Sequence, residues 1–285
     1  MTDFRFTRVA VVGARSQIGR YLLPRLKTAG CLVFSIGREA SHSDGDQVYA
    51  FDEKEAAFTP SLGVVDAIVS LAPLPSIEVV MKMAAALGAM RVIAFGSTGR
   101  FTKEASASLI EQDFVSQQVA AERRFKDVSE DSGIAWTLFR PTMIYGTDAD
   151  LNVTFIKSFI RRFGFFPLPF GAKGLRQPVH ADDLAAACVA ALGCENSFHR
   201  AYNLGGGERL AYADMVRRIF SSEGKRARVV AVPAQLLYLF VGIVSRFPKY
   251  NFVRREMVDR MFEDLIADNT PAKKDFEYCP RMFQC

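Results

Sequence analysis

One short run combines residue types and spacing that suit chemistry, Val12-Gly13-Ala14-Arg15-Ser16-Gln17-Ile18-Gly19. It lies between an apolar stretch, 9–12, and a helical pattern that begins at residue 18. Glycines at such a junction permit a tight turn, and the N–H groups at the start of the next helix attract phosphate. The run therefore predicts a site for the pyrophosphate of a dinucleotide.

Charged residues near this turn indicate which dinucleotide fits. Sites for NAD(H) usually carry a carboxylate at the end of the second strand, where it binds the ribose 2′-hydroxyl. Here Gly37 and Arg38 occupy that point, and Arg15 lies in the turn. Guanidinium groups bind phosphate well, so we expect NADP(H) rather than NAD(H), although Glu39 argues the other way. Asp52 is a candidate adenine contact or an ordinary turn residue.

Strand and helix patterns alternate around these residues. Apolar runs predict strands at 9–12, 31–36, 66–71, 91–95 and 135–139, and helical spacing predicts helices at 18–27, 76–87 and 111–128. Such alternation implies right-handed crossovers and a parallel sheet with helices on both faces. Leu71-Ala72-Pro73 ends the third strand, where its backbone would lie along the dinucleotide.

The pattern changes after Gly146. Residues 155–170 hold six phenylalanines with interspersed Pro and Gly, so no long regular element is expected there. We expect an α/β fold, a doubly wound parallel Rossmann sheet with a smaller, interleaved C-terminal lobe. Residues 1–145 with about 176–205 would form the dinucleotide-binding domain, and 146–175 with 206–285 the lobe for a substrate or partner.

Four motifs together resemble the extended and atypical short-chain dehydrogenase/reductase superfamily, and more narrowly its NAD-dependent epimerase/dehydratase branch. They are the run 13–19, Phe95-Gly96-Ser97-Thr98, the run 138–146 (LFRPTMIYG) and the run 176–185 (RQPVHADDLA). The resemblance extends from about residue 9 to 204, and more weakly to 283. It implies that Thr98 hydrogen-bonds the substrate and that Pro141 lies beside the cofactor.

The resemblance also exposes a departure. In that family a Tyr, its pKa lowered by a Lys one helical turn later, transfers the proton. Aligned on Glu122, Phe114 occupies the Tyr position and Gln118 the Lys position. Neither side chain carries the required proton or charge, so the family's relay is absent and enzymatic activity is an open question. Four other residues are alternative candidates for an acid or base, but none is expected to act as one: Tyr145, Arg100, Lys103 and His180.

Three substrate contacts follow from the same resemblance. Arg176 would hold the diphosphate of a nucleotide sugar, Asn152 would lie near the uridine and Phe170 against the base. Read as ordinary residues, Arg176 would form an exposed salt bridge and Phe170 would pack in a core.

A second resemblance leads to different functions. The runs 163–169 and 176–179, with the stretch 233–248, look like the dehydrogenase-like accessory subunit of respiratory complex I, which binds NADP(H) without the Tyr–Lys pair. The apolar run 236–244 would then be the counterpart of that subunit's apolar docking segment, although such runs are more often core helices than membrane or partner faces. Three hypotheses remain: an enzyme acting on a nucleotide-linked sugar, a cofactor-bound scaffold or assembly factor, and an NADP(H)-sensing regulator.

Composition excludes several other classes. The 36 basic and 31 acidic residues give a net charge of +5, and the basic residues are scattered, so no nucleic-acid partner is expected. Five cysteines and three histidines show no metal-ligand spacing, so no metal site is expected, and the cysteine pattern suits a reducing compartment. No apolar run is long enough to span a membrane and no signal peptide is evident, so we expect a cytoplasmic protein.

Overall fold

A computed structural model of the chain describes residues 6–37, 41–43, 46–52, 57–59, 62–147, 150, 152–246 and 254–285. The chain forms two compact units. The first unit comprises Met1–Pro141, Ala181–Leu204 and Asp268–Cys279. The second unit comprises Thr142–His180, Gly205–Ala267 and Pro280–Cys285.

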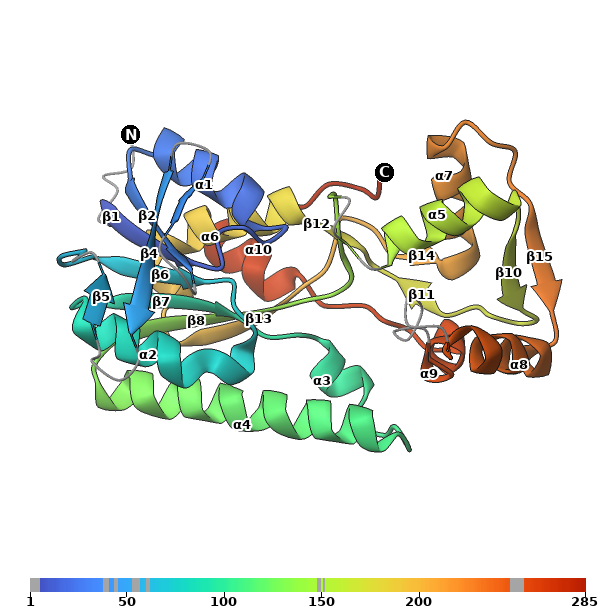
Figure 1. The fold of residues 1–285 in the computed structure, drawn as a ribbon, viewed down its shortest axis with the longest axis horizontal. Coiled ribbons are helices and arrows are strands. Elements are labelled where there is room, and N and C mark those ends of the chain that lie inside the picture. Colours follow the sequence, from blue (N-terminus) through green and yellow to red (C-terminus); the bar gives the residue numbers. More distant parts are fainter. Residues whose placement is uncertain are drawn as a thin grey trace. The chain divides into compact units, whose positions relative to one another are not determined.

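The first unit alternates strands and helices along most of its length (Figure 1). Its elements are β1 (Arg8–Val12), α1 (Gly19–Thr28), β2 (Leu32–Gly37), β3 (Ser41–Ser43), β4 (Asp46–Asp52), β5 (Ala57–Thr59), β6 (Ala67–Ser70), η1 (Leu74–Ser76), α2 (Ile77–Ala86), β7 (Arg91–Phe95), α3 (Gly99–Thr102), α4 (Leu109–Asp131), β8 (Ala135–Pro141), α6 (Ala181–Leu192), η2 (Glu195–Ser197), β13 (Arg200–Leu204) and α10 (Thr270–Phe276).

One sheet organises this unit. Its strands follow the order β13-β8-β7-β6-β1-β2-β4-β3, and β5 pairs with β4. The seven strands from β13 to β4 are parallel, whereas β3 and β5 run antiparallel to β4. Helices α1 and α6 cover one face, and α2 and α4 cover the other (Figure 1). The expected doubly wound parallel sheet is confirmed.

Buried strands explain why this sheet forms. Every residue of β6 and β7 is buried, as expected for parallel strands that are covered on both faces. From β1 the sheet grows in two directions. Strands β2 and β4 follow on one side of β1, and β6, β7, β8 and β13 follow on the other, so the strand order reverses between β1 and β6. Ligands of open α/β sheets bind at such a point, outside the carboxyl ends of the strands. The topology therefore directs attention to the segments that follow β1 and β6.

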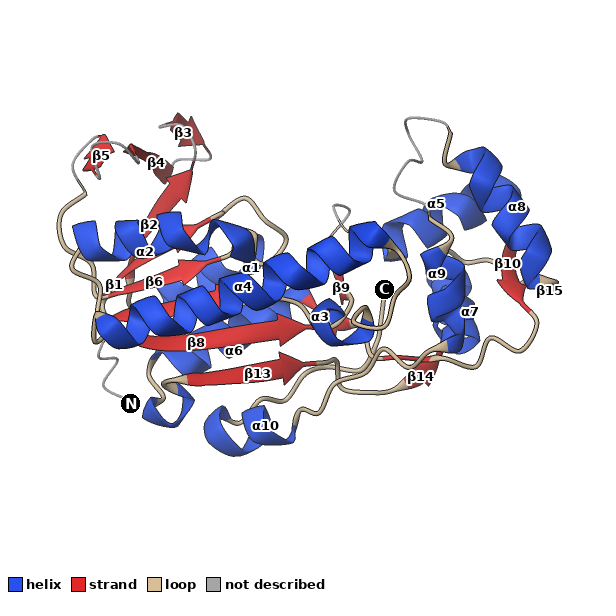
Figure 2. Ribbon diagram, turned by 90° about the horizontal axis from the view of Figure 1, so that it is seen from below, coloured by secondary structure: helices blue, strands red, loops and turns tan. Residues whose placement is uncertain are grey.

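The second unit is built from short helices and strands (Figure 2). They surround a core of aliphatic and aromatic side chains. They are β9 (Ile144–Tyr145), α5 (Val153–Phe163), β10 (Phe166–Pro169), β11 (Leu175–Arg176), β12 (Val179–His180), β14 (Leu210–Ala211), α7 (Tyr212–Ser222), β15 (Val229–Val232), α8 (Ala234–Val244), α9 (Glu256–Asp259) and η4 (Arg260–Phe262). Three strand pairs connect these segments. They are β9 with β12, β10 with β15 and β11 with β14.

The phenylalanine-rich stretch 155–170 contains more helix than the sequence suggested. Helix α5 continues to Phe163, and Gly164 ends it with a left-handed φ of 74°. Ile156 and Ile160, one turn apart, face the core of the second unit, and Phe166 of β10 joins them there. Gly164 thus ends α5 after Phe163, and the Pro and Gly residues of this stretch do not prevent the helix from forming.

Candidate functional site

The turn after β1 lies at the strand-order reversal of the first unit. Gly13 has a φ of 77°, in the region that favours glycine, and its N–H donates to Ile36 O over 3.2 Å. A Cβ built on Gly13 would lie 3.3 Å from Leu71 C and 3.4 Å from Ala72 N, in the segment after β6. The structure thus brings together two of the predicted cofactor segments, 13–19 and 71–73.

The other end of the turn is equally close-packed. A Cβ on Gly19 would lie 2.0 Å from Ala14 O, so only glycine fits where α1 starts. Ser16, which replaces the family's middle glycine, accepts a hydrogen bond at Oγ from the Gly19 N–H over 3.2 Å, and its own N–H donates to Gly13 O. The serine side chain therefore closes the turn and satisfies one donor of the first helical turn.

The remaining turn residues differ in exposure. Arg15 is exposed, Ile18 is buried, and Gln17 is half-buried. The Gln17 Oε1 atom is buried and, within the described part of the chain, has no hydrogen-bond partner. Two residues predicted to contact the cofactor cannot be placed in this way: Arg38 lies outside the described residues, as does the side chain of Asp52 at the end of β4.

Thr98 lies between β7 and α3, beside the end of β8. Its N–H and its hydroxyl both donate to Pro141 O, over 3.2 and 3.0 Å. The predicted substrate contact and the predicted cofactor contact are therefore neighbours. The hydroxyl keeps its acceptor lone pairs, because it acts only as a donor in this bond.

Phe114 of α4 packs against Gly99, the residue after Thr98. A Cβ on Gly99 would lie 3.3 Å from Phe114 Cε1. The Lys103 ammonium lies 4.4 Å from the centre of the Phe114 ring and 3.4 Å from Glu111 Oε1. Cations favour the face of an aromatic ring, so a phenylalanine is well accommodated here.

Gln118, one turn after Phe114, is buried in the same face of α4. Its Oε1 atom has no hydrogen-bond partner among the described residues. One turn further, Glu122 accepts hydrogen bonds from Arg140 Nε and Nη2 over 2.8 and 2.7 Å, and it pairs with Arg100 Nη1. This buried ion-pair cluster fixes α4 against the end of β8. In the sequence, Glu122 indicated only how this helix aligns with the family pattern, and its ion pairs with Arg100 and Arg140 were not predicted.

The three residues predicted to bind substrate belong to the second unit. Arg176 is 2% exposed. Its Nη1 donates to Leu175 O and Glu263 O over 2.8 Å each, its Nη2 donates to Arg260 O over 2.5 Å, and its guanidinium lies 4.8 Å from the Tyr212 ring centre. Burial lowers the pKa of Arg176. In this structure Arg176 therefore fastens β11 to the segment 260–263.

The other two predicted contacts lie at the start of α5 and just after β10. Asn152 precedes α5 and lines a small apolar cavity with Phe155 and Tyr212. Phe170 follows β10, is mostly exposed, and donates its N–H to Val232 O over 2.9 Å. Within the described residues, the side chains of Asn152, Phe170 and Arg176 share no hydrogen bond or ring contact.

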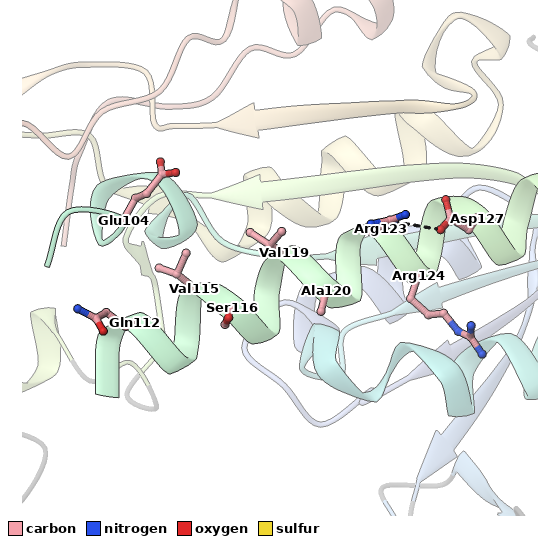
Figure 3. A pocket seen from close by; sticks show the side chains of 9 residues that line it. All are labelled: Glu104, Gln112, Val115, Ser116, Val119, Ala120, Arg123, Arg124 and Asp127. Carbon is pink, nitrogen blue, oxygen red and sulfur yellow. Dashed lines mark ion pairs between the residues drawn. The ribbon is translucent and has the colours of Figure 1, made fainter. Parts of the chain in front are cut away.

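A groove of about 670 Å³ lies elsewhere on the first unit, along α4 (Figure 3). It is lined by Glu104, Gln112, Val115, Ser116, Val119, Ala120, Arg123, Arg124 and Asp127. These α4 positions repeat at helical spacing on the side opposite to Phe114, Gln118 and Glu122. The groove is thus separate from the turn and from Thr98.

Among the described residues, no group of three or more His, Cys, Asp or Glu side chains is placed to hold a metal ion. No helix in the described ranges has both the length and the apolarity to cross a bilayer.

Solved structures share this architecture over nearly the whole chain. UDP-N-acetylglucosamine 4-epimerase from Bacillus cereus matches with a TM-score of 0.71 and 15% identity, covering 98% of this chain and 95% of that one. The fold is that of the NAD-dependent epimerases. The NADPH-dependent quinone oxidoreductase of Escherichia coli, solved with NADPH, shares the epimerase fold with a TM-score of 0.71 and 17% identity, covering 96% of each chain.

Curated relatives of the chain are distant. NAD(P)H azoreductase of Xenophilus azovorans is 26% identical over 234 residues, 79% of this chain and 77% of that protein. A mitochondrial NADH dehydrogenase 1 alpha subcomplex subunit 9 of Arabidopsis thaliana is 25% identical over 154 residues, 50% of this chain. UDP-glucose 4-epimerase of Vibrio cholerae is 23% identical over 172 residues, 60% of this chain. The last two matches span only 38% and 49% of those relatives' lengths. No protein-family model matches the chain.

Proposed function

We propose that the chain is a nicotinamide-dinucleotide-binding protein, with the dinucleotide held at the Gly13–Gly19 turn. The observation that carries this proposal is the close approach of Gly13 to the backbone of Leu71 and Ala72 at the strand-order reversal. It leaves a pyrophosphate free to approach the start of α1 without meeting a side chain at Gly13. The names of the relatives, an NAD(P)H azoreductase and an NADH dehydrogenase subunit among them, support the same class of ligand.

Specific residues of the first unit would hold the dinucleotide. The backbone of Ser16, Gln17 and Ile18 would face the pyrophosphate, and the segments 71–73 and Pro141 would border the remainder. Arg15 and Arg38 favour NADP(H) over NAD(H), because guanidinium groups suit a 2′-phosphate. When bound, the dinucleotide supplies a hydride donor or acceptor. Thr98 would orient a hydroxyl of a substrate, which would donate to Thr98 Oγ1, because the Thr98 hydroxyl already donates its own proton to Pro141 O.

For the reaction itself, we propose a short-chain-dehydrogenase-like protein without the family's Tyr–Lys relay. Phe114 packs against Gly99, immediately after Thr98, which is where a relay Tyr would be needed. Gln118 is buried one turn later and carries no charge that would lower the pKa of a neighbour. The substrate would be a nucleotide-linked sugar, a class that appears in the names of two epimerase relatives.

A cofactor-bound scaffold is the second candidate, and Arg176 favours it. A diphosphate clamp needs a guanidinium whose donors face the ligand, but Arg176 directs three hydrogen bonds to backbone carbonyls. To bind phosphate, the guanidinium would have to leave those carbonyls. Similarity to a subunit of a plant NADH dehydrogenase supports the same candidate, with the second unit as the face that binds a protein partner.

Thermal unfolding with NADPH, with NADH and without ligand tests the proposal. One-site binding at 100 times Kd adds about 2.7 kcal/mol, which for this size corresponds to roughly 5–10 °C. We expect the larger shift with NADPH, and we expect Arg38→Ser to reduce that shift while leaving the NADH shift unchanged. Arg20→Ser, an exposed change on α1, is the matched control.

Two readouts separate the remaining outcomes. No shift with either nucleotide, together with no nucleotide released on denaturation, would refute dinucleotide binding. Adding UDP-glucose to the NADPH-bound protein then distinguishes the two candidates. A further rise in Tm supports the sugar-nucleotide protein, whereas an unchanged Tm supports the scaffold.

A further inference from the structure

Helix α8 of the second unit is apolar on two sides. Its eleven residues include no charged side chain. Leu237 and Val241, one turn apart, are buried against Val258 and form the inward stripe. The outward stripe, which we call the α8 stripe, consists of Leu236, Leu239, Phe240 and Ile243, which are 56%, 62%, 44% and 50% exposed. Positions i, i+3, i+4 and i+7 form one face of a helix.

An outward stripe of this kind needs an explanation. A surface helix ordinarily places polar residues on the side that faces water, and a helix that is apolar all round is normally buried. Helix α8 lies against β10 and α9 (Figure 1), and its inward stripe also packs against Phe155 and Val232. The neighbouring strands add further exposed apolar side chains, Val230 in β15 and Phe165 and Phe170 on either side of β10. A helical stripe of four exposed apolar side chains marks an interaction site.

The charge distribution indicates what this site would bind. The segments of the second unit contain 17 Lys and Arg against nine Asp and Glu, a net charge of +8. The first unit contains 19 against 22, a net charge of −3, and the two together give the +5 of the whole chain. The positive charge of the protein is therefore concentrated in the unit that carries the α8 stripe.

Cations also lie at the stripe itself. A groove of about 450 Å³ is lined by Leu239 and Ile243 of the stripe together with Arg246 and Arg255. Both arginines are exposed, and the Arg255 guanidinium lies 5.1 Å from the centre of the Tyr238 ring. Apolar side chains flanked by guanidinium groups match the boundary between acyl chains and anionic head groups.

We propose that the α8 stripe docks the second unit on the surface of an anionic membrane. Leu236, Leu239, Phe240 and Ile243 enter the boundary of the acyl chains, and Arg246 and Arg255 bind lipid phosphates. An eleven-residue helix is about 16 Å long, about half of the hydrocarbon thickness, so it lies in the surface and does not cross it. A second copy of the chain is the poorer occupant, because two second units, each with a net charge of +8, repel each other. The proposal does not depend on the dinucleotide.

Vesicle flotation of the full chain tests this docking. We expect binding to phosphatidylcholine vesicles that contain one third phosphatidylglycerol, weaker binding to pure phosphatidylcholine, and a decrease with added salt. Leu239→Glu with Ile243→Glu should reduce binding at least tenfold. Leu109→Glu with Ile110→Glu is the matched control, because it makes the same charge change at exposed apolar positions of α4 in the first unit. Arg246→Ser with Arg255→Ser should reduce only the preference for anionic vesicles.

Folding and cofactor binding are monitored separately. All variants should unfold within a few degrees of the wild type and keep the same thermal response to NADPH, so a failure of docking is distinct from a failure of dinucleotide binding. Three results would overturn the proposal. The first is the absence of binding to either kind of vesicle. The second is an equal loss of binding in the α4 control variant. The third is a dimer of the wild type that dissociates in the α8 variant and not in the control. Binding to soluble polyglutamate without vesicle binding would likewise assign the face to an acidic polypeptide instead.

Discussion

At the scale of single residues, the turn after β1 depends on the absence of two side chains. Gly13 permits the left-handed φ, and Gly19 permits the close approach of the Ala14 carbonyl. Ser16 contributes in a different way, because its hydroxyl accepts the N–H of Gly19. The serine is thus compatible with a turn of the dinucleotide-binding kind, since it adds a hydrogen bond inside the turn.

Gly19→Ala should destabilise the protein. The added methyl group would meet Ala14 O at 2.0 Å, which is backbone and moves only with the whole turn. Overpacking of this kind costs about 1–3 kcal/mol, or a fall in Tm of roughly 2–10 °C. Gly193→Ala, where an added Cβ meets no atom within 4 Å, is the control and should leave Tm unchanged. Equal Tm values for both variants would contradict this account of the turn.

A single carboxylate holds the start of β1. Asp66 Oδ2 accepts hydrogen bonds from the N–H groups of Thr7 and Arg8, each over 2.8 Å, and from the Thr7 hydroxyl. Partial burial raises the pKa of Asp66, but these hydrogen bonds outweigh it and lower the pKa below its usual value. A lowered pKa in the folded state stabilises the protein above the unfolded pKa, about 3.9, and this contribution is lost as the pH falls through the folded pKa.

Asp66→Asn should therefore have a pH-dependent effect. At pH 7 we expect a loss of about 1 kcal/mol, typical of a charge-assisted hydrogen bond that is weakened and not removed. Thermal unfolding of the wild type and of the variant should give different Tm values at pH 7. That difference should shrink as the pH falls below about 4. A difference that stays constant with pH would show that the carboxylate charge plays no part.

At the scale of elements, α4 presents three successive turns to the end of the sheet. Phe114 packs on Gly99, Gln118 is buried, and Glu122 binds Arg100 and Arg140. The ion-pair cluster fixes the register of the helix, so the first two positions are held in place whatever side chains they carry.

Restoring the family's relay should not by itself restore strong activity. In Phe114→Tyr with Gln118→Lys, the new ammonium would occupy a buried position, and burial lowers the pKa of a lysine and disfavours its charged form. We expect a lower Tm and no strong turnover of UDP-glucose with NAD(P). Turnover is followed by the absorbance of the reduced nucleotide. Robust turnover would refute the prediction and would mean that only the relay had been lost from an intact pocket.

The elements that the sequence predicted best are those with a strong local pattern. The buried apolar strands β1, β6, β7 and β8 were located to within about two residues, because a parallel strand covered on both faces is a continuous apolar run. Helix α5 was missed, since its phenylalanines hid the helical spacing of Ile156 and Ile160. The hydrogen bonds of Arg176 were also missed, because its partners lie more than 80 positions later in the chain.

At the scale of the whole molecule, distant segments complete each unit. Phe276 of α10 packs on Phe139 of β8 in the first unit, with ring centres 5.8 Å apart. In the second unit Phe283 packs on Tyr145, with ring centres 4.8 Å apart, and the Phe283 N–H donates to Glu208. No sequence pattern predicted these contacts, because a single aromatic residue in a short segment has no periodicity that could indicate what it packs against.

Phe283→Ala should therefore destabilise the second unit strongly. Phe283 is 1% exposed and lies in the main apolar core of that unit. Truncating a buried phenylalanine costs about 3–5 kcal/mol. Its neighbour Met282 is 63% exposed, so Met282→Ala is the control and should have little effect. Chemical denaturation measures both, and equal losses would contradict the placement of the last residues in the core.

The order in which the segments alternate has a consequence for synthesis on the ribosome. The chain passes between the two units five times, and the last passage lies between Cys279 and Pro280. Phe276 and Phe283 are translated well after their ring partners Phe139 and Tyr145, yet each belongs to the packing of its unit. The nascent chain therefore cannot complete either unit until residues 268–285 have left the ribosome. During that interval the exposed α8 stripe and the unfilled aromatic cores are available to chaperones.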